Sequence, residues 1–255
     1  MTETVSILGG TGNLGFGLAI RLGAAGFTVC LGSRDGERAR DAAVRARDLI
    51  GGGTFVGCLN DEAVAQADRL IVAAVPFVSH AATLKGVADG WRPGHVLLDT
   101  TVPLATAIGG RATHLVEPWH GSAAQQARAT INAEVAVASG LHTISAAALR
   151  DLERPLGQDT LICGDREAKA VVTDVLEHID GLRVVDAGSL EMSRLLEGLT
   201  PVLIGINMRN KTHAGIQVTR LDVPRTVRSQ NPVLSAKTPR VALAAGHNDV
   251  GLGSS

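Results

Sequence analysis

The chain has 255 residues, of which 45% are hydrophobic and 19% are charged, so it is a folded globular protein rather than a disordered one. Its 24 Lys and Arg residues are balanced by 25 Asp and Glu residues, and aromatic residues make up only 2%. Without a basic excess or aromatic stacking surfaces, we expect no binding of nucleic acid. No apolar window approaches the ~18 residues of a membrane span, and no leader segment is recognisable. We therefore expect a cytoplasmic protein that binds no membrane.

Strand and helix signals alternate along the first hundred residues, which predicts a parallel sheet covered by helices on both faces. Short apolar runs predict strands over residues 5–8, 28–31, 54–56, 69–75, 96–99, 134–139, 160–163 and 182–185. Apolar residues at helical spacing, or Ala- and Arg-rich composition, predict helices over 14–25, 35–49, 60–67, 79–89, 168–179 and 190–208. Asn60 is expected to cap the third of these helices. Residues 100–122 are predicted to be irregular, and 141–144 to form a loop.

This pattern predicts a Rossmann-type α/β fold, with a doubly wound, mainly parallel sheet, a small C-terminal α/β addition and a long final helix. We place a dinucleotide-binding domain at residues 1–139 and a smaller acceptor-binding part at 140–220. From residue 221 to 255 the periodicity disappears, and this segment is expected to be a tail, an arm or a disordered extension. Three scattered cysteines predict neither a disulfide framework nor a zinc site, and we expect them to be buried thiols.

A glycine motif follows the first predicted strand and opens the first predicted helix. It consists of Gly10, Thr11, Gly12, Asn13, Leu14 and Gly15, and it fits the dinucleotide fingerprint GxGxxG. Gly10 would allow a tight turn, Gly12 would let the backbone approach a pyrophosphate, and Gly15 would let the helix pack closely. The free N–H groups at the start of the helix would bind the phosphates.

The residues after the second predicted strand distinguish between two cofactors. Sites for NAD place a carboxylate there to bind the ribose hydroxyls, whereas this chain has Ser33 and Arg34, with Arg38 one helical turn later. A hydroxyl and two guanidinium groups suit a 2′-phosphate, so the sequence favours NADP(H) over NAD(H).

Several motifs, taken in order, resemble the family of F420-dependent NADP oxidoreductases over residues 5–220. They occur in residues 7–34, 75–76, 102–103, 141–144, 163–165, 179–183, 186–188, 199–201 and 213–216. The resemblance implies hydride transfer between NADPH and the deazaflavin coenzyme F420. It also implies that Thr11, Gly12, Asn13 and Leu14 hold the pyrophosphate, that Ser33, Arg34 and Arg38 bind the 2′-phosphate, and that Val75, Pro76, Val102 and Ala146 complete the cofactor site.

The same resemblance implies a site for the second ring. Its residues would be Phe77, Val102, Pro103, Leu141, His142, Thr143, Ile144, Thr200 and Pro201. His142 is our catalytic candidate, because a nearby donor would stabilise the negative charge that a reduced deazaflavin gains; a local packing role is equally compatible. A bulky residue at Gly140 or Thr143 should block the acceptor alone. The chain departs from the family at Phe77, at Ser145, at residues 99–101 and at residues 117–120, all near this acceptor side.

Three functions fit these observations. The first is an oxidoreductase that uses NADPH and F420, the second is an NADPH-dependent reductase of a flavin, ferric complex or imine, and the third is a non-enzymatic NADP-binding regulator. The chain has no Tyr, which excludes the Tyr-dependent chemistry of short-chain dehydrogenases. Hydride transfer between two stacked rings needs orientation more than acid–base groups. We expect only small-molecule partners, a homodimer and no metal.

Overall fold

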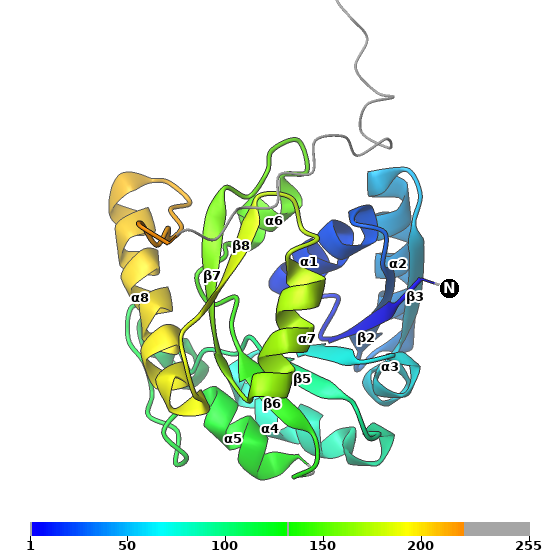
Figure 1. The fold of residues 1–255 in the computed structure, drawn as a ribbon, viewed down its shortest axis with the longest axis horizontal. Coiled ribbons are helices and arrows are strands. Elements are labelled where there is room, and N and C mark those ends of the chain that lie inside the picture. Colours follow the sequence, from blue (N-terminus) through cyan, green and yellow to red (C-terminus); the bar gives the residue numbers. More distant parts are fainter. Residues whose placement is uncertain (1, 132, 222–255) are drawn as a thin grey trace, which may run out of the picture.

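The computed structural model describes residues 2–131 and 133–221, and within them the strands form one sheet of eight (Figure 1). The strands are β1 (Thr4–Leu8), β2 (Thr28–Ser33), β3 (Thr54–Leu59), β4 (Leu70–Ala73), β5 (Val96–Asp99), β6 (Ala136–Ser139), β7 (Gln158–Gly164) and β8 (Leu182–Asp186). The helices are α1 (Asn13–Ala24), α2 (Gly36–Ile50), α3 (Asn60–Gln66), α4 (Phe77–Gly86), α5 (Ala123–Thr130), α6 (Ala146–Arg150), α7 (Arg166–Leu176) and α8 (Ser193–Asn210). Short 3-10 turns are Ala88–Gly90, Ala105–Ile108 and Leu190–Met192.

The strand order is β3-β2-β1-β4-β5-β6-β7-β8, and every pair of neighbouring strands is parallel except β6 and β7. The predicted doubly wound fold is confirmed, since the first six strands have the order of a dinucleotide-binding sheet. The last two strands extend the same sheet beyond the antiparallel junction. The division into domains at residue 139 stays a prediction, and residues 222–255 lie outside the described part.

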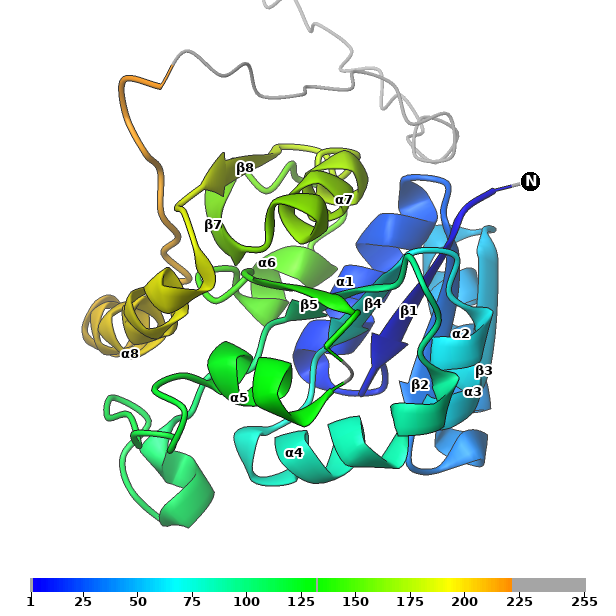
Figure 2. The same ribbon diagram turned by 60° about the horizontal axis from the view of Figure 1, so that its bottom comes forward.

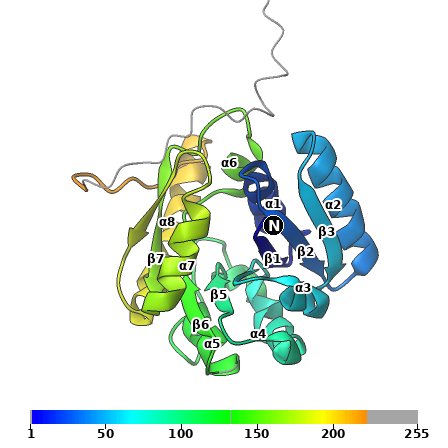
Figure 3. The same ribbon diagram turned by 45° about the vertical axis from the view of Figure 1, so that its right-hand side comes forward.

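The two faces of the sheet are apolar and bury separate sets of helices. Leu97 and Leu98, neighbours on β5, belong to opposite hydrophobic clusters, because successive side chains of a strand point to opposite faces. Helices α1, α2, α6 and α7 pack on one face, and α3, α4 and α5 on the other (Figure 2). Helix α8 lies beside β7, at the opposite end of the molecule from β3 (Figure 3).

Helices α5 and α6 were not predicted. Helix α5 buries only three alanines, Ala123, Ala124 and Ala127, so its sequence carries almost no apolar periodicity. Its cap is Ser122, whose Oγ accepts a hydrogen bond of 3.0 Å from the N–H of Gln125. Helix α6 has five residues, too few for a periodic pattern.

All three cysteines are buried free thiols, as predicted. The structure adds a contact that their spacing did not indicate. The Sγ atoms of Cys30 and Cys58 lie 2.9 Å apart on the neighbouring strands β2 and β3. The two thiols are therefore within hydrogen-bonding distance of each other inside the core.

Candidate active site

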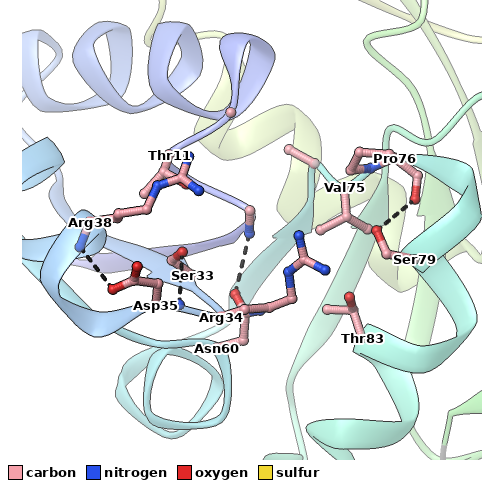
Figure 4. Close-up of a pocket in the computed structure, with 13 residues that line it drawn as sticks. Thr11, Ser33, Arg34, Asp35, Arg38, Asn60, Val75, Pro76, Ser79 and Thr83 are labelled. Atoms are coloured by element: carbon pink, nitrogen blue, oxygen red, sulfur yellow. Dashed lines mark hydrogen bonds between the residues drawn. The ribbon is translucent and has the colours of Figure 1, made fainter.

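A cavity of about 380 Å³ opens at the carboxyl ends of β1, β2 and β4. Open α/β sheets bind ligands at this edge. Figure 4 shows side chains from three separate loops and from α4 converging on it. The lining residues are Gly9, Thr11, Gly12, Ser33, Arg34, Asp35, Arg38, Asn60, Ala74, Val75, Pro76, Ser79 and Thr83. The cavity thus brings together most of the residues that we predicted to bind a dinucleotide.

The loop after β1 turns sharply at Gly9, which has a left-handed φ of +74°. We expected Gly10 in this role, but Gly10 instead packs against β2, where an added Cβ would lie 2.9 Å from the Cα of Leu31. The packing role of Gly15 is confirmed. A Cβ there would lie 2.6 Å from the carbonyl oxygen of Gly9, so only glycine lets α1 begin this close to the loop.

The amino end of α1 offers unused hydrogen-bond donors. No side chain caps this helix, and its first internal bond runs from Phe16 N to Gly12 O at 2.8 Å. The N–H groups of Asn13, Leu14 and Gly15 precede that bond and have no acceptor within residues 2–131 and 133–221. This arrangement fits a pyrophosphate, because donors and the helix dipole both favour an anion.

The end of β2 presents one hydroxyl and two guanidinium groups to the same cavity. Ser33 is 7% exposed, and its Oγ accepts a hydrogen bond of 3.2 Å from Asp35 N. Arg34 and Arg38 are exposed, and within the described residues neither side chain forms an ion pair. Both guanidinium groups are therefore available to a phosphate.

Asp35 also lines this cavity, and our sequence analysis overlooked it. Its Oδ1 accepts hydrogen bonds from Glu37 N at 3.0 Å and from Arg38 N at 3.2 Å. The carboxylate therefore caps α2, where the helix dipole stabilises its charge. Because it faces these N–H groups, it leaves the two arginine side chains unpaired.

Asn60 has a different role from the one we predicted. It is the first residue of α3 rather than its cap, and Leu59 occupies the cap position. The Oδ1 of Asn60 instead accepts a hydrogen bond of 3.3 Å from Gly9 N. This amide joins the start of α3 to the glycine loop 51 residues away, a relationship without any local signal in the sequence.

The loops after β4 and β5 are held together beside the cavity. Val75 and Pro76 line the cavity, and Phe77 begins α4. The Oγ1 of Thr101 donates to the carbonyl oxygen of Val75 at 3.3 Å. The predicted acceptor residues 102–103 directly follow Thr101. The loop after β4, which lines the dinucleotide cavity, therefore helps to position them.

A buried ion pair lies beneath these two loops. Asp99, the last residue of β5, accepts a hydrogen bond on Oδ1 from Thr101 N at 2.9 Å, and its Oδ2 lies 2.7 Å from Nε2 of His80 on α4. Burial opposes the charged form of both groups. Their mutual attraction and hydrogen bond outweigh it, so the pKa of His80 is raised and the pKa of Asp99 is lowered.

The segment after β6 is buried against β7. Leu141 has a φ of +64°, and its N–H donates to Thr160 Oγ1 at 2.9 Å. Thr143 Oγ1 donates to the carbonyl oxygen of Asp159 at 3.4 Å. Leu141 and Ile144 belong to the hydrophobic core, so their side chains support this segment from below.

Gly140 lies too deep for the acceptor role that we expected of it. A Cβ there would lie 2.8 Å from Cγ2 of Ile162, inside the core. Bulk at this position would push β7 away, so the expectation that it blocks only the acceptor is wrong. Thr143 is 5% exposed, and a bulky residue there meets the same difficulty.

His142 is 8% exposed, and burial lowers the pKa of its imidazole to about 4. Its Nε2 lies 3.4 Å from Ser139 Oγ, while Nδ1 is buried without a partner among the described residues. The ring is therefore neutral at neutral pH and carries one N–H donor. The backbone carbonyl oxygen of His142 accepts a hydrogen bond of 2.8 Å from Thr200 Oγ1, which links this segment to α8.

Arg150 is a second residue that sequence analysis missed. It ends α6, the helix that Ala146 begins, and its Nη2 donates to Asn13 Oδ1 at 2.8 Å. Its guanidinium also lies 5.8 Å from the centre of the Phe16 ring. It therefore joins the C-terminal part to the start of α1, across 137 residues of sequence.

The structure thus separates the predicted residues into two groups. The predicted dinucleotide residues that line the cavity are Thr11, Gly12, Ser33, Arg34, Arg38, Val75 and Pro76. Outside its lining lie Gly10, Asn13, Leu14, Gly15 and Ala146, together with the predicted acceptor residues at 77, 102–103, 141–144 and 200–201. Within the part of the chain that is described, no group of three or more His, Cys, Asp or Glu side chains is arranged to hold a metal ion. No helix among these residues is long and apolar enough to span a membrane.

Comparison with known proteins gives concordant results. Residues 4–103 match the family model described as NADP oxidoreductase, coenzyme F420-dependent. The F420-dependent NADP reductase of Methanothermobacter thermautotrophicus is 38% identical over 226 residues, covering 87% of this chain and 97% of that protein. The corresponding protein of Methanocaldococcus jannaschii is 38% identical, with 86% and 99% covered. A candidate F420-dependent NADP reductase from Arthrobacter has the same fold, with a TM-score of 0.72 at 23% identity, over 86% of this chain and all of its own.

Proposed function

Since the chain belongs to the family of F420-dependent NADP reductases, we propose that it is an oxidoreductase that transfers a hydride between NADPH and coenzyme F420. The observation that carries this proposal is the cavity at the end of β2. There, unpaired Arg34 and Arg38 and the hydroxyl of Ser33 meet the free donors of α1. This is the chemistry that distinguishes the phosphorylated nicotinamide cofactor from its unphosphorylated form.

The cofactor supplies the hydride, and this chain binds and orients it. We assign the pyrophosphate to the loop Thr11–Leu14, through the free N–H groups of Asn13 and Leu14, with Gly12 and Gly15 providing the close approach. Ser33, Arg34 and Arg38 bind the 2′-phosphate. Val75 and Pro76 line the path from the adenosine to the nicotinamide.

We place the acceptor over the loops at the carboxyl ends of β5 and β6. The residues that we propose to bind it are Phe77, Val102, Pro103, Leu141, His142, Thr143, Ile144, Thr200 and Pro201. Val102 and Ala146 would also border the nicotinamide. Support comes from the bond between Thr200 and the His142 carbonyl, which brings α8 to the same edge of the sheet. On this assignment residues 140–220 form the acceptor-binding part.

His142 is our candidate for stabilising charge on the acceptor. Because burial keeps the pKa of its imidazole at about 4, it acts as a neutral donor and brings no positive charge. Hydride transfer also requires the two rings to be held about 3–3.5 Å apart. The buried packing of this segment supports that rigidity.

A spectroscopic assay tests the proposal. NADPH added to the protein with F420 should bleach the visible absorbance of F420, and NADH should do so far more weakly. If F420 stays oxidised from mildly acidic to alkaline pH while a flavin, a ferric complex or an imine is reduced, the acceptor assignment is wrong. If NADPH is bound but no acceptor oxidises it, the chain is a binding protein and not an enzyme.

We also propose a cytoplasmic homodimer. Buried free cysteines are typical of a reducing compartment. Helix α8 exposes Leu195, Val202 and Met208, which are 62%, 57% and 71% exposed. Apolar groups of this kind along one helix suit a contact with a second copy. Sedimentation velocity should give twice the mass of the chain, and charged residues at these positions should halve it.

A further inference from the structure

Helix α8 lacks one of its internal backbone hydrogen bonds, next to the residues proposed to bind the hydride acceptor. Pro201 lies inside this helix and has no N–H to donate to the carbonyl oxygen of Glu197, four residues earlier. Proline also disfavours helical geometry at Thr200, the residue before it. The orientation of this turn therefore depends on contacts outside the helix.

One such contact is made by the side chain of Glu197, which is 1% exposed. Its Oε2 accepts a hydrogen bond of 3.1 Å from Ala123 N, and its Oε1 accepts one of 3.2 Å from Ala124 N. These are the first two residues of α5, whose N–H groups have no acceptor within the helix; burial raises the pKa of the Glu197 carboxyl group that accepts from them to about 8. A hydrogen bond of 2.6 Å between the hydroxyls of Ser122 and Ser193 joins the same two helices.

The opposite contact of this turn reaches the acceptor segment. Thr200 lies three residues after Glu197, and its Oγ1 donates to the carbonyl oxygen of His142 at 2.8 Å. One turn of α8 is thus bonded to α5 by the carboxyl group of Glu197 and to the segment after β6 by the hydroxyl of Thr200. A shift of the turn at Glu197 would move Thr200 and weaken its hydrogen bond to the carbonyl oxygen of His142.

We propose that Glu197 is a positioning residue that fixes the proline-containing turn of α8 against α5, and thereby sets the orientation of the acceptor segment 141–144. It acts through Thr200 and touches neither substrate. The dinucleotide cavity is built from other elements, so the effect is confined to the acceptor. This inference rests on the proposed function for the identity of that acceptor.

The test compares Glu197→Ala and Glu197→Gln with the wild type. Glu197→Ala should lower kcat/KM for F420 roughly 10- to 100-fold, the cost of a misplacement of about 1 Å, while the dissociation constant for NADPH stays unchanged. Glu197→Gln keeps the volume and one acceptor oxygen, so it should recover part of this loss. Glu191→Gln, an exposed change just before α8, is the matched control and should leave both quantities unchanged. Equal losses for both substrates, or no loss, would overturn the proposal.

A second variant approaches the same contact from the other side. Ala123→Pro removes the N–H that donates to Oε2 at the first position of α5, where proline is compatible with a helix. It should reproduce the selective loss for F420 even if Glu197→Ala does not fold. Normal kcat/KM for F420 in a folded Ala123→Pro protein would contradict the inference.

Hydrogen–deuterium exchange separates this inference from the proposed function. Peptides covering residues 122–130 and 140–146 should both exchange faster in Glu197→Gln than in the wild type, whichever acceptor is used. Unchanged exchange over 140–146 would show that Glu197 does not position this segment. If exchange responds but the wild type never reduces F420, the positioning role stands and the acceptor assignment fails.

Discussion

The carboxylate of Asp99 and the imidazole of His80 lie 2.7 Å apart, and both side chains are fully buried. The pair connects the end of β5 with α4, the helix that begins at the predicted acceptor residue Phe77. Breaking a buried pair leaves an uncompensated charge, which costs about 3–5 kcal/mol. Removing either partner alone should therefore destabilise the fold beneath the proposed site.

Asp99→Asn should lower the free energy of unfolding by about 3–5 kcal/mol near pH 6. The lowered pKa of Asp99 contributes stability that is lost as the pH falls through it, and the raised pKa of His80 contributes stability that is lost as the pH rises through it. The difference between variant and wild type should therefore shrink at both extremes. Urea unfolding over a pH series measures it, with the exposed Asp89→Asn as control. A difference independent of pH would contradict this account.

Arg34→Ala should weaken NADPH binding by about 1.5–3 kcal/mol, the range for hydrogen bonds to charged groups. Binding of NADH should hardly change, because it lacks the phosphate that this guanidinium is expected to bind. Titration calorimetry with both cofactors measures the difference. Arg40→Ala, an exposed change on the same helix as Arg38, is the matched control. Equal losses for NADPH and NADH would refute the phosphate assignment.

Gly15→Ala should destabilise the protein by about 1–3 kcal/mol through overpacking. The added Cβ would lie 2.6 Å from a backbone oxygen of Gly9, which has no flexible end that can move aside. The displaced start of α1 should also raise the dissociation constant for NADPH. Gly52→Ala meets nothing within 4 Å and is the control for a harmless methyl group. Equal stability of the two variants would show that the loop tolerates the contact.

His142→Asn should make the protein more resistant to acid relative to the wild type. Burial depresses the pKa of this imidazole from 6.5 to about 4, so the wild type takes up a proton on unfolding between these values and loses stability as the pH falls. The variant lacks this titrating group. Between pH 7 and pH 4, the free energy of unfolding of the wild type should therefore fall by about 3 kcal/mol more than that of the variant. Unfolding curves at several pH values test this, with exposed His120→Asn as control. A stability difference between variant and wild type that does not change with pH would show that the His142 imidazole is exposed to water.

The sequence predicted the dinucleotide half well, because its signals are local. Glycine spacing, apolar periodicity and the residues after β2 all lie within about one strand–helix–strand unit. It missed α5, which packs through alanines, and the contacts of Asn60, Glu197 and Arg150. Their partners lie 51, 74 and 137 residues away, so only the folded chain brings them together. It also placed Gly140 at the acceptor, because spacing does not distinguish a surface glycine from one packed against Ile162.

If the proposed function is right, the hydride passes directly from NADPH to the ring carbon of a deazaflavin, and isotope transfer can follow it. NADPH carrying deuterium at the transferred position should be mixed with the protein and F420 in ordinary water. Mass spectrometry of the reduced F420 should then show one deuterium per molecule, since a hydrogen bound to carbon does not exchange with solvent. Reduced F420 without deuterium, or no reduction while another acceptor is reduced, would contradict the account.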